Sequence, residues 1–343
     1  MKTRDILLVG SIPLEDTGSV LDLVADTLGD DIARIPDGET GARSKFITWQ
    51  APVLGAAEQF TVEELGPQSE WGPNGEYPPR VIKLKPGASG TPDFPPTGYA
   101  DAALESWAVF RERVAAGKIG AATRFQVCLP TPLGVLATFM EADGQEMSEP
   151  AYAARLTEDL DRVCREIPSD KLTIQWDVPT DIAIWENHKD TYFDDPHQGI
   201  VDRLVSFMNR VPEAAEMGMH LCYGDISHRH WTEPDLGLMA RFTNAVLAGL
   251  DRRLDYVHLP VPAGWTSPDE FAALRDFDLP TGTAMHLGLV HHTDGVEGAR
   301  RRIEAASVHR ADFGVATSCG LGRREPADLQ DILRLHADVA AIR

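Results

Sequence analysis

The sequence lacks any long apolar run. Among its 343 residues there is no stretch of 18 consecutive apolar side chains, which excludes an ordinary transmembrane helix. Only about five apolar residues follow the first charged residues before Gly10, too few for the apolar core of a signal peptide. We therefore expect a cytoplasmic protein that does not interact with a membrane.

Basic residues are also scarce. The chain has 32 Lys and Arg against 53 Asp and Glu, giving a formal net charge of −21. Proteins that bind duplex nucleic acid rely on basic side chains to neutralise phosphates, and anionic membrane surfaces attract the same groups. The composition thus argues against both partners. It identifies no substrate, because net charge describes solubility and the long-range field.

Cysteine is rare, with four residues in the whole chain. In a large chain without a secretory signal this number does not indicate a disulfide framework, and it agrees with a reducing compartment. A cysteine close to a histidine is then a candidate metal ligand or nucleophile. A glycine fingerprint of the G-x-G-x-x-G type is also missing after the first apolar run, which disfavours a dinucleotide-binding sheet.

Eight short apolar runs recur along the chain. Each is four to seven residues long, rich in aliphatic or aromatic side chains, and bounded by Gly, Pro or Asp, as expected of buried strands. They cover residues 5–10, 32–35, 124–129, 172–178, 219–223, 254–259, 285–290 and 312–317.

Amphipathic segments separate these runs. They cover residues 19–28, 101–116, 150–166, 199–210, 234–250, 267–275, 295–306 and 326–342. Eight strand–helix alternations predict an α/β protein with one (β/α)₈ barrel of the TIM type spanning residues 1–343. A doubly wound open sheet is the alternative, since it alternates in the same way.

One segment interrupts the alternation. Residues 66–98 contain 14 Gly or Pro among 33 residues, so they cannot be regular helix or sheet throughout. We interpret residues 42–98 as a long Pro/Gly-rich insertion after the second strand. A long ordered loop usually acts as a lid, a binding loop or a contact in a homo-oligomer. The alternative is an excursion with little order.

Polar side chains gather where the predicted strands end. Ser11 follows the first strand, Glu39 follows the second, and Asp177 ends the fourth. In a (β/α)₈ barrel the chemistry lies at this end of the strands, so these side chains should share one mouth. Glu39 and Asp177 could hold a cationic group such as an amino-acid ammonium. Alternatively, each makes only loop or helix-cap hydrogen bonds.

A second group of polar residues has the chemistry of a zinc site. His220 and Cys222 are two apart on a predicted strand and therefore point to one side, while His258 and Cys319 are placed at the ends of neighbouring strands. Zinc takes thiolate and imidazole ligands. We predict His220, Cys222 and Cys319 as ligands and His258 as a fourth. The alternative is a buried histidine with two inert cysteines.

The seventh strand ends in a segment with two candidate catalytic residues, His291 and Asp294. A histidine can supply an acid near neutral pH. His291 and His292 are adjacent and should point in opposite directions, so at most one of them faces the mouth. The alternative is a structural histidine.

Six motifs, in order, match one family. The chain resembles the catalytic barrel of cobalamin-independent methionine synthase, in the superfamily that includes uroporphyrinogen decarboxylase. The matching segments are Val9-Gly10-Ser11-Ile12-Pro13, Asp37-Gly38-Glu39 for H-G-E, Gln175-Trp176-Asp177-Val178-Pro179 for Q-x-D-E-P, His220-Leu221-Cys222-Tyr223 for H-x-C-Y, Val290-His291 for I-H-S-P, and Ser318-Cys319-Gly320-Leu321 for D-C-G-L.

The resemblance implies roles for these residues. His220, Cys222 and Cys319 would bind zinc, and Ser11, Glu39 and Asp177 would hold the amino-acid part of a thiol substrate. His291 would deliver a proton to the departing methyl carrier. The implied activity is transfer of a methyl group from a folate donor to a thiol bound as zinc thiolate, as in methionine biosynthesis.

The sequence departs from the family at three points. Val178 replaces the glutamate of Q-x-D-E-P, His292 replaces the serine after the family's histidine, and the resemblance implies that His258 stands in the place of a glutamate ligand. The chain also lacks the family's folate-associated N-terminal barrel. These departures favour a zinc-dependent methyl- or alkyltransferase with another donor, such as the epoxide–thiol transferases of this superfamily. A metal-independent barrel lyase, hydratase or decarboxylase, and a non-catalytic ligand-binding barrel, are the alternatives.

Overall fold

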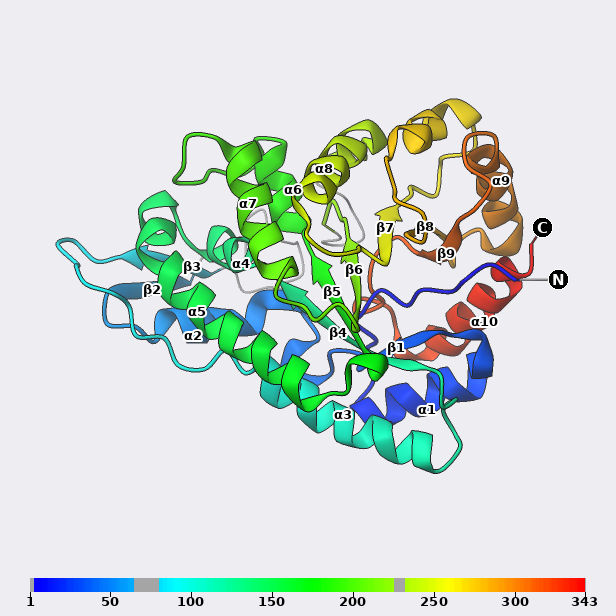
Figure 1. The fold of residues 1–343 in the computed structure, drawn as a ribbon, viewed down its shortest axis with the longest axis horizontal. Coiled ribbons are helices and arrows are strands. Elements are labelled where there is room, and N and C mark those ends of the chain that lie inside the picture. The colour runs from blue at the N-terminus through cyan, green and yellow to red at the C-terminus, as the bar shows by residue number, and fades with distance from the viewer. Residues whose placement is uncertain (1–2, 65–79, 225–231, 343) are drawn as a thin grey trace.

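Parallel strands surrounded by helices form the centre of the molecule. The computed structural model describes residues 3–64, 80–224 and 232–342. Seven strands form one parallel sheet in the order β1-β4-β5-β6-β7-β8-β9 (Figure 1). Their bounds are β1 (Arg34–Pro36), β4 (Arg124–Pro130), β5 (Leu172–Asp177), β6 (Glu216–His220), β7 (Tyr256–Pro260), β8 (Ala284–Val290) and β9 (Gly314–Thr317).

The segment around Ile6 links the two edges of this sheet. Ile6 forms parallel bridges with Ile32, just before β1, and with Val315 in β9. The Leu7 amide donates to the Val315 carbonyl at 3.0 Å, and the Val315 amide donates to the Asp5 carbonyl at 2.8 Å. This segment therefore takes the place of the eighth strand and closes the sheet, as the (β/α)₈ prediction requires.

Helices on the outside connect successive strands. They are α1 (Thr17–Leu28), α3 (Tyr99–Ala115), α5 (Ala142–Glu166), α7 (Pro196–Met208), α8 (Leu236–Gly249), the 3₁₀ helix η5 (Pro268–Asp276), α9 (Gly295–Ser307) and α10 (Leu329–Ala340). Their buried stripes cover the sheet with apolar side chains. Within the described residues, no helix combines the length and apolar character needed to cross a bilayer.

The strands agree with the predicted runs except at the fifth. β6 begins at Glu216 and ends at His220, whereas the run 219–223 was predicted, so Cys222 lies beyond the strand. The polar Glu216 hides the start of the strand in the sequence. Its carboxylate accepts two hydrogen bonds of 3.0 Å from the Arg34 guanidinium, which compensates for its position inside the barrel.

Two short helices after strands were not predicted. They are α4 (Pro132–Phe139) and α6 (Pro179–Trp185). α4 is buried on almost every side, so its sequence has no amphipathic period to detect. α6 starts directly after β5 with a proline at its first position, which suits a helix N-terminus. It fixes the chain just beyond Asp177.

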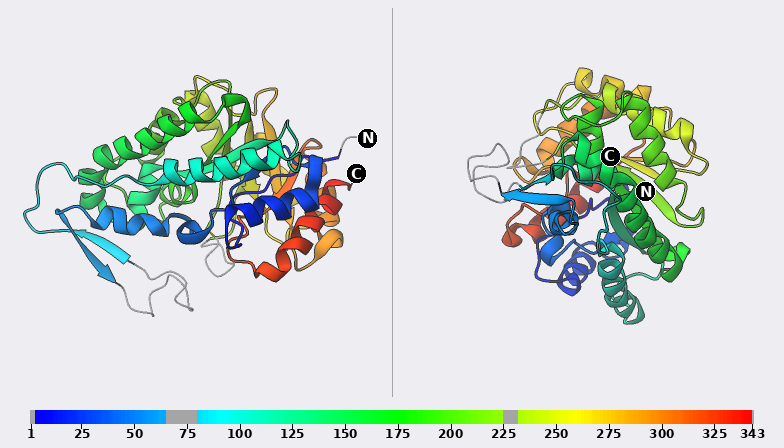
Figure 2. Two further views of the ribbon diagram at one scale, coloured as in Figure 1. Left: turned by 90° about the horizontal axis from the view of Figure 1, so that it is seen from below. Right: turned by 90° about the vertical axis from the view of Figure 1, so that its left-hand side faces the viewer.

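The segment between β1 and α3 contains regular structure. It includes α2 (Ala51–Gly55) and an antiparallel pair, β2 (Phe60–Glu64) and β3 (Arg80–Leu84), which extends from one end of the barrel (Figure 2). Phe60 stacks on Phe94, and Phe94 packs edge-on against Tyr152 of α5. The described part of this segment is thus anchored to the barrel helices. Residues 65–79 lie outside the described structure, and the lid role of 42–98 stays a prediction.

Candidate active site

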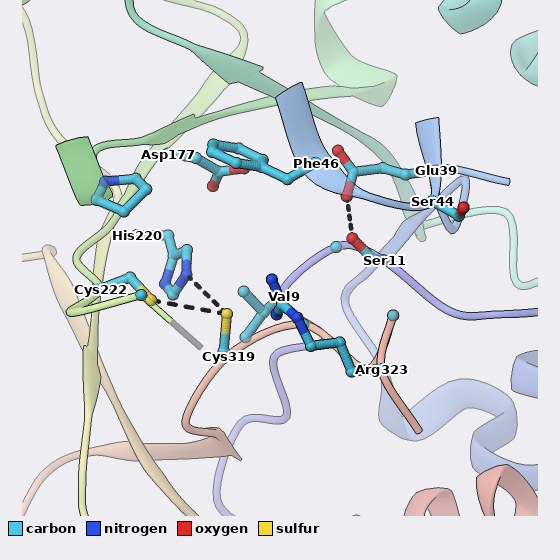
Figure 3. A pocket seen from close by; sticks show the side chains of 15 residues that line it. Val9, Ser11, Glu39, Ser44, Phe46, Asp177, His220, Cys222, Cys319 and Arg323 are labelled. Atoms are coloured by element: carbon cyan, nitrogen blue, oxygen red, sulfur yellow. Dashed lines mark hydrogen bonds between the residues drawn. The ribbon is translucent and has the colours of Figure 1, made fainter. Parts of the chain in front are cut away.

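A pocket opens at the carboxyl ends of the barrel strands. Its walls come from the loops after the Ile6 segment, β1, β5, β6 and β9, which the topology brings to one end of the barrel (Figure 3). The residues lining it are Val9, Gly10, Ser11, Glu39, Ser44, Phe46, Asp177, Pro179, His220, Cys222, Gly224, Cys319, Gly320, Gly322 and Arg323. Six of the predicted site residues therefore share one cavity.

His220, Cys222 and Cys319 meet on one side of this pocket. His220 ends β6, Cys222 follows two residues later, and Cys319 follows β9. Their ligand atoms all lie within 4.8 Å of one another, with 3.7 Å between the two Sγ atoms and 3.9 Å from Cys319 Sγ to His220 Nε2. Two sulfurs and one imidazole nitrogen can hold a metal ion, and the donor set fits a catalytic zinc with one open position.

The local environment favours the ionised form of Cys319. A hydrogen bond from Cys222 lowers the pKa of the Cys319 thiol well below its usual value, although burial opposes the shift, and the positive charge of Arg323 adds to the lowering. A thiolate is the form that binds metals. This side of the pocket is therefore suited to a cation.

His258 is not placed as the fourth ligand that was predicted. It lies in the middle of β7, fully buried, and β8 separates its strand from β9 and Cys319. Its Nδ1 is 2.7 Å from Nδ1 of His220, and its Nε2 is 2.9 Å from the Thr317 carbonyl. Both ring nitrogens already have protein partners. Burial and the neighbouring His220 hold the pKa of His258 well below its usual value.

Two carboxylates face the pocket near the Cys/His group. Ser11 Oγ donates to Glu39 Oε2 in a short hydrogen bond, and Gln175 Nε2 donates to Asp177 Oδ1 at 2.8 Å. Glu39 and Asp177 are only 9% and 7% exposed. Burial raises the pKa of both carboxyl groups, the charge of Asp37 adds to the rise at Glu39, and the charge of Glu39 adds to the rise at Asp177. A cation placed between them would reverse these shifts.

Close loop packing holds Ser11 and Glu39 in position. The Ile12 amide donates to the Gly38 carbonyl at 2.8 Å, and the Leu321 amide donates to the Ser11 carbonyl at 2.7 Å. A Cβ atom on Gly322 would approach the Ser11 Cβ to 2.9 Å, so this contact requires glycine. The loops after the first segment, β1 and β9 therefore form one unit.

The turn that carries Glu39 is strained. Glu39 has a φ of 49°, and Phe46, which also lines the pocket, has a φ of 54°. Non-glycine residues rarely adopt this left-handed conformation, and such strain concentrates at functional sites. Asp37 accepts from the Glu39 amide at 2.9 Å and from Arg43 at 2.7 Å, which stabilises the turn.

The buried Glu39 should make stability depend on pH. Its folded-state pKa is raised from 4.5 to about 7, chiefly by burial. The folded state therefore binds more protons between these values, and stability is lost as pH rises through 7. In metal-free protein, the free energy of unfolding of Glu39→Gln relative to that of wild type should therefore rise by up to about 3 kcal/mol between pH 4 and pH 8. Urea unfolding of both proteins at pH 4 and pH 8 measures this change. If the variant and the wild type differ by the same amount at both pH values, the prediction is wrong.

His291 and Asp294 do not line the pocket, contrary to the predicted catalytic role. His291 Nε2 donates to the Val261 carbonyl at 2.9 Å, and burial together with Arg302 lowers its pKa to about 4. A histidine with this pKa is unprotonated near neutral pH and therefore does not serve as a general acid there. Asp294 accepts two hydrogen bonds, at 2.7 and 2.8 Å, from the fully buried Arg302, which requires a carboxylate partner.

Sequence reasoning did not assign three side chains that line the pocket, Ser44, Phe46 and Arg323. Ser44 and Phe46 lie between β1 and α3, where no periodic pattern marks a residue as facing the barrel. Arg323 belongs to the basic pair Arg323-Arg324 that follows Cys319-Gly320-Leu321, and this pair was the available signal. Residues of the 42–98 segment thus contribute to the pocket wall.

Comparisons with known proteins give structural matches only. Neither a protein-family model nor a curated protein matches the chain. A B12-independent methionine synthase from Shewanella sp. W3-18-1, solved in complex with selenomethionine, is 14% identical with a TM-score of 0.63, over 100% of this chain and 98% of that one. A methyltransferase from Methanosarcina mazei is 14% identical with a TM-score of 0.49, over 99% and 94% of the two chains.

The first match covers both chains almost completely, so the described elements and their order correspond to one barrel. At this identity the likeness concerns the fold and not the reaction. The chain therefore has a methionine synthase-like (β/α)₈ barrel fold.

Proposed function

We propose that this protein is a zinc-dependent enzyme that transfers a methyl or other alkyl group to a small thiol. The observation that carries the proposal is one pocket lined both by His220, Cys222 and Cys319 and by the carboxylates of Glu39 and Asp177. A thiol that also bears an amino group would complement both halves of this pocket. The proposed localisation is cytoplasmic.

The three Cys/His residues would hold the metal. Their ligand atoms already lie close together, and two thiolates with one neutral imidazole would leave Zn²⁺ without net charge. Bound there, zinc would lower the pKa of a thiol so that its nucleophilic thiolate form persists at neutral pH. Cys319 is suited to bind the metal as a thiolate, because the hydrogen bond from Cys222 lowers the pKa of its thiol.

The carboxylates would orient the thiol. Burial raises the pKa of Glu39 and of Asp177, and neighbouring negative charges add to the rise, so an ammonium group between the two carboxylates would relieve an existing electrostatic cost. Ser11 and Gln175 donate to the two carboxylates and fix their positions. Holding the amino group in this way would place the sulfur end of the substrate toward the Cys/His side.

The alkyl donor is a separate part of the proposal. A folate methyl donor is one candidate, supported by the fold shared with a methionine synthase. A strained electrophile such as an epoxide is the other, supported by the positions of His291 and His258. Neither lines the pocket, so neither is placed to protonate a leaving group there. An epoxide oxygen could instead take a proton from solvent.

A metal-independent lyase or hydratase is a second candidate. The raised pKa of Glu39, about 7 through burial, supports it, because a carboxyl group with this pKa can donate and accept a proton near neutral pH. In this case the Cys/His group would have no part in turnover.

Removal of the metal separates the two candidates. Zinc-loaded protein would be incubated with aminothiols and either a methyl-folate or an epoxide, and the loss of free thiol would be followed. We expect that a strong chelator abolishes thiol alkylation and that added Zn²⁺ restores it. Turnover of a substrate without thiol, unchanged by the chelator, would instead support the lyase or hydratase.

A further inference from the structure

We infer that His258 is a positioning residue that holds the His220 ring in the tautomer whose Nε2 can bind a metal. The inference rests on the proposed function, since it assumes that His220 is a zinc ligand. It assigns His258 a role different from the ligand role predicted from the sequence.

The hydrogen bonds of His258 give its proton a defined place. The Thr317 carbonyl, 2.9 Å from His258 Nε2, can only accept a hydrogen bond, so Nε2 must carry a proton. His258 is fully buried, and the groups beside it on neighbouring strands are His220, His286 and this carbonyl, none of them acidic. An imidazole in such surroundings is neutral and has one proton only.

The tautomer of His220 follows from that of His258. Because the proton of His258 is on Nε2, its Nδ1 is an acceptor. The contact of 2.7 Å between the two Nδ1 atoms then requires a proton on His220 Nδ1. The lone pair of His220 is therefore on Nε2, the atom that lies 3.9 Å from Cys319 Sγ.

The Nε2 lone pair of His220 faces the two cysteine sulfurs. Cys222 donates to Cys319 Sγ, His220 Nε2 lies 3.9 Å from the same sulfur, and the three ligand atoms all lie within 4.8 Å of one another. The thiol protons leave when a metal binds, while the proton on His220 Nδ1 stays. A partner on the far ring nitrogen that fixes the tautomer is typical of metal-binding histidines, and its loss costs 10- to 100-fold in affinity.

The test compares His258→Leu with His258→Asn. Leucine removes the acceptor, whereas the asparagine side-chain oxygen can take the place of Nδ1. We expect His258→Leu to bind zinc roughly 10- to 100-fold more weakly in competition with a chelator, and His258→Asn to keep most of the affinity. His286→Leu is the matched control, since His286 is also fully buried, lies next to His258 in register and bonds to Asp5 instead of His220. Its zinc affinity should stay unchanged.

A second measurement reads the tautomer of His220 directly in the wild-type protein. In metal-free wild type labelled with ¹⁵N-histidine, long-range ¹H–¹⁵N spectra should show the His220 proton on Nδ1, with the signal assigned by its loss in His220→Gln. In His258→Leu the proton should move toward Nε2. A His220 proton on Nε2 in wild type would overturn the inference, as would wild-type zinc affinity in His258→Leu or two imidazole ligands in zinc X-ray absorption spectra. Zinc binding with these properties but without thiol alkylation would refute only the proposed function.

Discussion

Cys319→Ser should bind zinc about 100-fold more weakly than wild type. Structural zinc sites with four ligands contribute roughly 10–16 kcal/mol, so each ligand accounts for about 3 kcal/mol. Cys319 Sγ lies 3.7 Å from Cys222 Sγ and 3.9 Å from His220 Nε2, and serine in its place removes one of the two thiolate donors. Elemental analysis after dialysis against a weak chelator measures the retained zinc.

Cys164→Ser is the matched control for this experiment. Cys164 lies on α5 and packs at the edge of the main core, away from the pocket. The Cys164→Ser variant should retain zinc as wild type does, and thiol alkylation should be lost in Cys319→Ser only. Full zinc occupancy in Cys319→Ser, or equal loss in both variants, would remove the basis for a metal centre at this position.

Asp177→Asn should lower kcat/KM for an aminothiol by about 100-fold. For the same thiol without its amino group, kcat/KM should stay at the wild-type value. Removing one member of a buried charge pair costs about 2–5 kcal/mol, and 2.7 kcal/mol corresponds to 100-fold. Asparagine preserves shape and can still accept the bond from Gln175 Nε2. The ratio of kcat/KM for the two thiols measures recognition of the ammonium group.

Asp181→Asn controls for the loss of a buried carboxyl group. Asp181 is 1% exposed and lies four residues from Asp177, but it accepts from Thr131 and does not line the pocket. The ratio of kcat/KM for the thiols with and without an amino group should stay at its wild-type value in Asp181→Asn. If Asp177→Asn affects both thiols equally, Asp177 has a structural role and the ammonium site must be placed elsewhere.

The barrel and the pocket carboxylates could be predicted because they depend on local patterns. Strands of a parallel sheet are buried on both faces and appear as short apolar runs. The carboxyl ends of such strands meet at one end of the barrel, so residues just after the runs share a mouth. This rule places Ser11, Glu39 and Asp177 in the pocket that the structure contains.

The roles of His258 and His291 could not be predicted from the same patterns. His258 has the chemistry of a ligand, but its register opposite His220 and its bond to Thr317 depend on strand pairing, which no local pattern encodes. His291 bonds to the Val261 carbonyl, and its pKa is lowered by burial and by Arg302, a buried cation whose partner Asp294 appeared in the sequence to be available for catalysis.

Closure of the barrel by the Ile6 segment has a consequence for folding. Ile6 and Val315 lie near opposite ends of the described chain, so their pairing forms a contact of very high sequence separation, which is slow to form. The Ser11 and Cys319 loops directly follow these two segments and are joined by the hydrogen bond from the Leu321 amide to the Ser11 carbonyl, so we expect them to meet when the segments pair. The complete Cys/His group would then be a late product of folding, and a metal that binds only there would shift the equilibrium toward the closed barrel by mass action.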